Sequence, residues 1–138
     1  NDRPEVLQFQ ETIKEYARQV GYTTTLMGRR RPLPNINSKH PGIRNASERA
    51  AINTPIQGGA ADIVMCAMIK INENKQLKRI KWKMLLQIHD EIIMEGPIEY
   101  QEEAKQILIQ CMEHPFQQDL SVPLTVDANI GKTWYDAK

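Results

Sequence analysis

The hydrophobic pattern of the first third of the chain predicts one amphipathic helix followed by a hairpin. In residues 5–20 apolar side chains recur at helical spacing, and the pattern ends at Gly21. The next stretch, YTTTLMGRRRPLPNI (22–36), begins with β-branched residues, turns at Met27 and Gly28, and then contains Pro32 and Pro34. This order predicts a short hairpin that leads into an irregular loop.

The middle of the chain predicts a longer helix that contains a proline. Asn45 or Ser47 is expected to cap it, because both are preferred N-cap residues. Pro55 has no N–H and its ring meets the carbonyl of Ala51, so the helix is expected to bend or restart there. The sequence QGGAADIVMCAMIKIN (57–72) then predicts a buried helical face. Its members are Ala60, Val64, Ala67, Met68 and Ile71.

The last half contains two apolar runs with acids between them. The runs KMLLQI (83–88) and EIIMEG (91–96) have strand length and predict a hairpin whose tight turn carries His89 and Asp90. A polar connection precedes this hairpin, an amphipathic helix follows Pro97, and SVPLTVDANIG (121–131) predicts a final strand. The order of elements predicts an α+β fold, with an antiparallel sheet and helices packed on one side of it.

Composition adds limits to this picture. The chain has 138 residues, 41% of them hydrophobic and 25% charged, which is typical of one ordinary globular domain. Cys66 and Cys111 are far apart without a CxxC spacing, so we expect buried reduced thiols and no zinc site. No apolar run approaches the roughly 20 residues of a membrane span, and no signal peptide is recognisable. The chain begins inside a helical pattern without Met, so we expect it to be part of a longer protein.

Charge is distributed unevenly. From Tyr16 to Ser47 there is no acid, and from Gln87 to Asp119 eight acids face Lys105 alone. For the acidic helix after Pro97 a solvated surface is the preferred interpretation. For the basic segment we favour nucleic acid over a solvated surface. Its cations are Arg18, Arg29, Arg30, Arg31, Lys39 and Arg44.

The adjacent acids Asp90 and Glu91 have two interpretations. An Asp in a hairpin turn is often structural, because its side chain can bond the nearby backbone. Two adjacent carboxylates at the end of apolar strands also repel each other unless a cation lies between them, and a hard divalent metal is the natural candidate.

Arg49, Asn53 and Gln57 recur at every fourth position and form one polar stripe on a helix. We call these three residues the donor stripe. Long donors in a row suit the DNA minor groove, where every base pair offers an acceptor whatever the sequence. A solvated helix face is the equal alternative. The small residues 58–61 that follow permit close approach of a nucleic-acid backbone or, at least as readily, tight helix packing.

Three motifs in this order, LMGRRRPLPNI, ERAAINTPIQGGAAD and LLQIHDEIIMEGP, resemble the C-terminal part of family A DNA polymerases, the DNA polymerase I type. The resemblance implies that Asp90 binds catalytic Mg²⁺ in a two-metal site, that Glu91 supports it, and that His89 lies near the primer terminus. It places the donor stripe in the minor groove at the primer-template junction. It assigns residues 1–45 to a fingers-side helix and basic loop and residues 46–138 to the palm.

The resemblance implies template-directed DNA synthesis, with primer-template DNA and dNTP as partners and with no membrane partner. The second metal-binding aspartate and the nucleotide-binding fingers helix are expected upstream in a parent chain, so the chain alone is expected to be inactive. The stretches 73–91 and 111–128 resemble organellar polymerases of plants and apicomplexan parasites, which implies an organelle. Gly59 stands where many relatives carry Thr or Ser.

Two other functions stay open at this point. The first is a non-catalytic nucleic-acid-binding module, against which the intact acid pair argues. The second is a metal-dependent nuclease, which would need Asp62 or Asp127 to converge on Asp90, although both residues fit ordinary structural positions.

Overall fold

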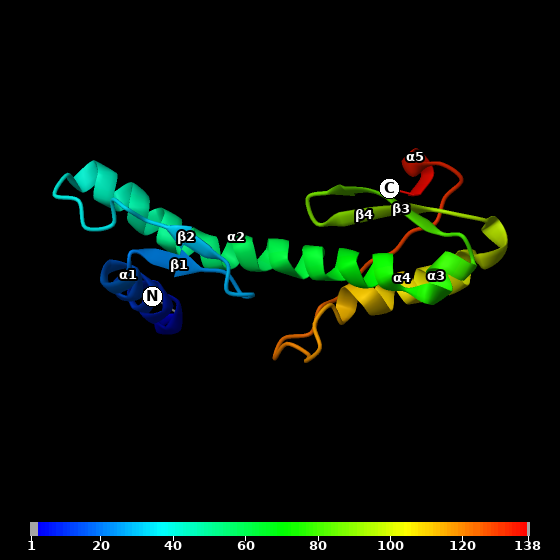
Figure 1. Cartoon of the computed structure of the whole chain (residues 1–138), viewed down its shortest axis with the longest axis horizontal. Helices are drawn as coiled ribbons and strands as arrows, with labels where there is room; N and C mark the ends of the chain where they lie inside the picture. The colour runs from blue at the N-terminus through cyan, green and yellow to red at the C-terminus, as the bar shows by residue number, and fades with distance from the viewer. Residues whose placement is uncertain (1–2, 138) are drawn as a thin grey trace. The chain divides into compact units, whose positions relative to one another are not determined.

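The computed structural model describes residues 3–137 and divides the chain after Asp62 into two compact units (Figure 1). The fold is α+β, as predicted. Its strands form two separate antiparallel hairpins among the described residues, in place of the single sheet that the order of elements had suggested.

The first unit begins with helix α1 (Pro4–Val20), which confirms the amphipathic helix expected there. The helix ends at Gly21, whose φ of 80° is readily adopted only by glycine and whose N–H donates to the Ala17 carbonyl at 2.8 Å. Strands β1 (Tyr22–Thr24) and β2 (Arg30–Pro32) then pair as the predicted hairpin. A small core joins these elements to the next helix. It consists of Ala17, Leu33, Ile36 and Ala51, with Ile13 and Ala50 packed against it.

Helix α2 (Pro41–Glu73) begins earlier than predicted. Pro41 occupies its first turn, where the missing N–H costs nothing, and the Arg44 N–H already donates to the His40 carbonyl at 2.9 Å. The prediction that Asn45 or Ser47 caps the helix is therefore wrong. The helix also continues through Pro55 without restarting.

The second unit packs a hairpin and helices around another core (Figure 1). The short helix α3 (Lys75–Arg79) lies in the segment expected to be a polar connection, and Asn74 caps it by accepting the Leu77 N–H at 2.9 Å. Strands β3 (Lys83–Ile88) and β4 (Glu91–Glu95) form the second hairpin. A 3-10 turn, η1 (Ile98–Tyr100), leads into α4 (Gln101–Glu113), and α5 (Trp134–Ala137) comes last. The core residues are Ile71, Leu77, Ile80, Ala104 and Cys111.

Two further expectations fail. Residues 121–131 contain no strand, because an extended segment becomes a strand only when a neighbouring backbone pairs with it, and both described hairpins are two-stranded. On the predicted buried face of α2, Ala67 and Ile71 are buried, whereas Ala60 is exposed.

The expectation that both cysteines are buried holds for Cys111 only. Both cysteines are free thiols; Cys111 is buried and Cys66 is half-buried. Burial raises the pKa of the Cys111 thiol. Within residues 3–137, none of the helices combines the length and the apolar character that crossing a membrane requires.

Candidate functional site

The tip of the β3–β4 hairpin is a two-residue turn made of His89 and Asp90, as predicted. Ile88 pairs with Glu91 and closes the turn. His89 adopts a φ of 54°, which is uncommon for a residue other than glycine and is found where surrounding contacts impose it. Here the side-chain amide of Gln87 donates to the His89 carbonyl. The turn therefore holds Asp90 in a defined backbone position.

A bulge and a tryptophan fix the body of this hairpin. Met84 pairs with Met94, but Leu86 pairs with Ile93, so Leu85 is the extra residue of a β-bulge. Met84, Met94 and Ile92 pack on the helical core, whereas the bulge leaves Leu85 and Leu86 exposed.

At the base of the hairpin, the Trp82 Nε1–H donates to the Pro97 carbonyl at 3.0 Å. A Cβ on Gly96 would lie 2.4 Å from the Trp82 ring, so glycine is required for this packing. These contacts of Trp82 fix the base of the hairpin that carries the turn.

The hairpin tip presents an exposed acid pair. Asp90 occupies the turn, Glu91 is the first residue of β4, and both residues are exposed, as is His89. Carboxylate oxygens are the ligands that Mg²⁺ prefers in proteins. Residues 3–137 contain no group of three or more His, Cys, Asp or Glu side chains placed to hold a metal. Within the described residues, Asp90 and Glu91 are therefore not part of a cluster of three or more candidate ligands.

The same observation bears on the nuclease alternative, which required Asp62 or Asp127 to join Asp90. Asp62 is buried and is held by the Arg29 guanidinium at 2.7 Å and by the Met27 N–H at 2.9 Å. Asp127 is exposed outside any helix or strand. The nuclease alternative therefore has no supporting ligand set within the described residues.

The donor stripe lies on α2, and all three of its residues are exposed. Ala51 and Thr54, which lie between these residues in the sequence, are buried within the first unit. Since a helix turns by about 100° per residue, Arg49 and Asn53 lie about 160° around the helix from Ala51. The hairpin side of α2 is thus packed, and the donor stripe is open to a ligand.

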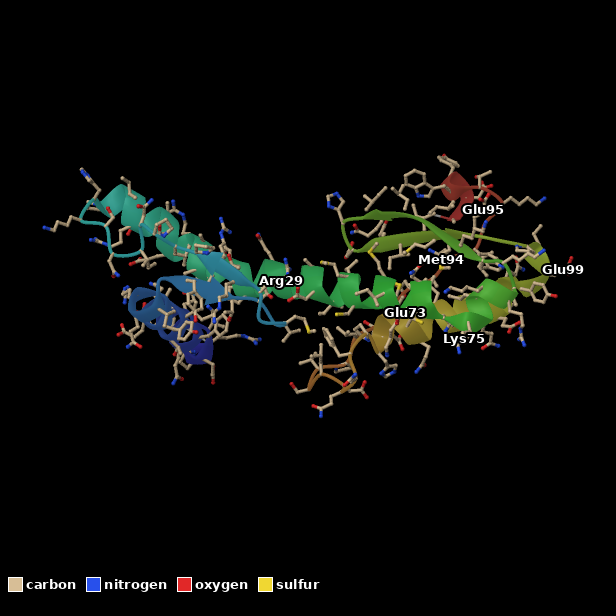
Figure 2. The ribbon with its side chains drawn as sticks, in the orientation of Figure 1. Arg29, Glu73, Lys75, Met94, Glu95 and Glu99 are labelled. Atoms are coloured by element: carbon tan, nitrogen blue, oxygen red, sulfur yellow. The ribbon has the colours of Figure 1, made fainter. Side chains whose placement is uncertain are left out.

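The three consecutive arginines that were expected to bind nucleic acid have different partners. Arg29, which is labelled in Figure 2, pairs with Asp62 and donates to the Gly58 carbonyl at 3.4 Å. The Cζ of Arg30 lies 4.5 Å from the centre of the Tyr22 ring, a cation–π contact. Arg31 donates to the Thr54 hydroxyl at 3.1 Å. All three arginines remain exposed, but Arg29 also anchors the hairpin to α2.

Burial and hydrogen bonding act on the Asp62 carboxylate in opposite directions. Burial alone raises the pKa of Asp62, but hydrogen bonds from the Thr25 hydroxyl, the Met27 N–H and the Arg29 guanidinium outweigh it and lower the pKa. Asp62 is therefore an ionised structural residue, which confirms the interpretation made from its position in the helix.

Sequence reasoning missed Thr23 and Thr54, whose hydroxyls donate to carbonyls of α2. Pro55 supplied a signal that could have found Thr23. A proline within a helix leaves the carbonyl four residues earlier without its usual donor, so a replacement donor is expected nearby.

Comparison with known proteins identifies the family. The family model described as DNA polymerase family A matches residues 1–136. Over 140 residues the chain is 54% identical to DNA polymerase I A, chloroplastic/mitochondrial, of Arabidopsis thaliana, covering 100% of this chain and 13% of that protein. Over 135 residues it is 47% identical to DNA polymerase I of Bacillus caldotenax, covering 98% of this chain and 15% of that protein.

A solved structure agrees with these relatives. The POL domain of Pol1 from M. smegmatis, in complex with DNA primer-template and dNTP, matches with a TM-score of 0.85 and 39% identity. The match covers 93% of this chain and 22% of that one. The chain thus spans only 13 to 15% of the curated relatives reported above, some of which carry chloroplastic or mitochondrial names. Because the family model matches residues 1–136 of this chain, the chain belongs to DNA polymerase family A.

Proposed function

We propose that the chain is part of a longer DNA-directed DNA polymerase that transfers nucleotides from dNTP to a primer 3′ hydroxyl in replication or repair. One observation carries the proposal beyond family membership: the HDE turn exposes Asp90 and Glu91 at the tip of a rigid hairpin. Such a tip could bring carboxylates to a divalent metal ion.

Asp90 would hold a catalytic Mg²⁺, with Glu91 as a supporting group and with the remaining ligands supplied by the parent chain. The bound metal supplies charge stabilisation and activation of the 3′ hydroxyl. Asp90 itself contributes a fixed negative charge at a defined position, and His89 lies in the same turn, near the proposed primer terminus. Because the described residues offer only part of a metal site, we expect the 138-residue chain alone to incorporate no nucleotide.

The first unit would contribute DNA contacts. The donor stripe of Arg49, Asn53 and Gln57 is exposed and suits minor-groove acceptors. Arg30 and Arg31 would add positive charge for phosphates, whereas Arg29 is held by Asp62. In this proposal residues 1–45 belong to the fingers side and residues 46–138 to the palm. The names of the plant relatives support a plastid or a mitochondrion as the place of action. An apicoplast rests only on the resemblance to apicomplexan polymerases.

Replacing the acid at the tip tests the proposal. In the full-length polymerase, Asp90→Asn keeps the size of the side chain and removes the negative charge, so incorporation should be abolished while primer-template affinity stays nearly unchanged. Asp127→Asn, at an exposed acid outside the hairpin, is the matched control and should keep full activity. Wild-type turnover by Asp90→Asn would remove Asp90 from the metal site.

The same measurements address the non-catalytic alternative. A DNA-binding module without chemistry would show duplex affinity in the full-length protein but no primer extension, with or without Asp90. Detectable extension by the unmodified protein and its loss in Asp90→Asn would exclude that alternative.

A further inference from the structure

A buried hydrogen bond joins β1 to α2. The Thr23 hydroxyl donates to the Ala51 carbonyl at 3.2 Å, although the two residues are 28 positions apart. Thr23 is 2% exposed and Ala51 is fully buried. In a regular α-helix the Ala51 carbonyl would accept from the N–H of residue 55, but that residue is proline and has no N–H. Thr23 therefore supplies the donor that α2 lacks.

A second hydroxyl acts beside the first. Thr54 donates to the Ala50 carbonyl at 2.7 Å, and Arg31 donates to the Thr54 hydroxyl at 3.1 Å. The carbonyls of Ala50 and Ala51 thus each accept a hydrogen bond from a threonine hydroxyl. The β1–β2 hairpin contributes Thr23 to one of these interactions and Arg31 to the other. Because this side of the helix is buried, water has little access to replace a lost donor, and an unpaired carbonyl there is costly.

The position of these bonds relates them to the donor stripe. Ala51 and Pro55 alternate along α2 with Arg49, Asn53 and Gln57. A proline in a helix interior normally kinks the helix, and a kink at Pro55 would turn Gln57 relative to Arg49. On a straight helix the stripe drifts by only about 40° per step, and a kink at Pro55 would add to this drift. The stripe can therefore follow a groove only if the backbone at Pro55 is held.

We propose that Thr23 is a positioning residue that, through the Ala51 carbonyl, holds the donor stripe in alignment across Pro55. This role rests on the proposed function, because alignment matters only if the stripe contacts a primer-template duplex. It assigns a part in duplex reading to a side chain that does not touch the duplex.

Hydrogen exchange in the full-length polymerase tests the bond itself. Thr23→Val keeps the shape of the side chain and removes the hydroxyl, so amides of α2 around residues 51–58 should exchange about tenfold faster. Thr23→Ser retains the hydroxyl and should restore slow exchange. Thr24→Val makes the same chemical change on the other face of β1 and should leave these amides unaffected.

A double-mutant cycle shows whether Thr23 compensates for the proline. Pro55→Ala provides the missing N–H, so the Ala51 carbonyl regains a helical donor. In that background Thr23→Val should accelerate exchange far less than it does beside Pro55. Equal acceleration in both backgrounds would overturn the proposal, because the hydroxyl would then stabilise the unit by ordinary packing.

Primer extension tests the positioning role. In single-turnover experiments, Thr23→Val should slow extension of matched primers more than that of mismatched ones, and Thr23→Ser should restore the matched-to-mismatched ratio. An unchanged ratio in Thr23→Val would overturn the positioning role even if the exchange cycle succeeds. If the unmodified polymerase extends no primer, the proposed function fails and the positioning role fails with it, while the exchange cycle still reports on the hydrogen bond.

Discussion

Two neighbouring glycines of α2 should respond oppositely to alanine. A Cβ on Gly58 would lie 2.4 Å from Cγ2 and 3.2 Å from Cβ of Thr25, whereas a Cβ on Gly59 would lie 3.6 Å from Cβ of Leu26, an ordinary contact. Alanine in a helix interior is favoured over glycine by about 1 kcal/mol. Gly59→Ala should therefore raise the free energy of unfolding by up to about 1 kcal/mol.

At Gly58 the same gain is offset by overpacking, which costs about 1 to 3 kcal/mol. The Thr25 methyl group cannot simply rotate away, because the Thr25 hydroxyl accepts the Arg29 N–H at 3.2 Å and also hydrogen-bonds to the Asp62 carboxylate. Gly58→Ala should therefore unfold more easily than Gly59→Ala by about 1 to 3 kcal/mol.

Equilibrium urea unfolding of the chain measures this difference, and local hydrogen exchange in the full-length polymerase provides a second measurement. Thr25→Ser is the matched rescue, because it removes the methyl group and keeps the hydroxyl. Adding Thr25→Ser to Gly58→Ala should recover most of the loss. Equal stability of the two alanine variants, or no recovery with serine, would refute the steric argument.

Three further predictions concern charge and duplex reading. Because the pKa of Asp62 is lowered on folding from its ordinary value of 3.8, its stabilisation is complete above that pH and is lost as the pH falls through the lower folded-state pKa. In Asp62→Asn the free energy of unfolding should thus fall less steeply below about pH 4, and its pH dependence between about pH 5 and 7 should stay unchanged. Unfolding of both proteins measured across this pH range tests the prediction. Arg30→Ala should lower the slope of log affinity against log salt for duplex DNA by about 1 at every sequence tested, and an unaltered slope would remove Arg30 from the phosphate contacts. Gln57→Ala in the full-length polymerase should reduce the advantage of matched over mismatched primers by roughly tenfold in single-turnover extension, whereas a merely structural role would slow both primers equally.

The elements that sequence predicted well are those whose cause is local. The helical spacing of residues 5–20 with Gly21 after it, and the two apolar runs around the HDE turn, each contain their own start and stop signals. Of the failures, the strand expected at the end of the chain needed information from elsewhere, whereas the cap of α2 had a local cause. Residues 121–131 have a strand-like pattern, but a strand also requires a partner. The cap of α2 was misplaced because Pro41 begins the helix before the preferred cap residues are reached.

The candidate site shows the same division. Its residues could be named from motifs, and the turn that carries Asp90 follows from the hairpin pattern alone. The partners of those residues could not be named, because Thr23 meets Ala51 across 28 positions and Arg29 meets Asp62 across 33. Pro55 indicates that the Ala51 carbonyl needs another donor, but no local pattern identifies which distant residue supplies it.

The arginine run illustrates what these distant contacts change. From sequence, Arg29, Arg30 and Arg31 are three equivalent cations for a phosphate backbone. In the structure the Arg29 Nε lies 2.7 Å from a buried carboxylate, so moving Arg29 to a phosphate would leave that charge unpaired, which is costly. Arg30 makes a cation–π contact with the Tyr22 ring, and Arg31 donates to the Thr54 hydroxyl. Losing either of these contacts costs less than leaving the Asp62 carboxylate unpaired. Counting charges therefore overestimates the phosphate contacts of this segment, and Arg29→Ala should weaken the fold of the first unit more than it weakens DNA binding.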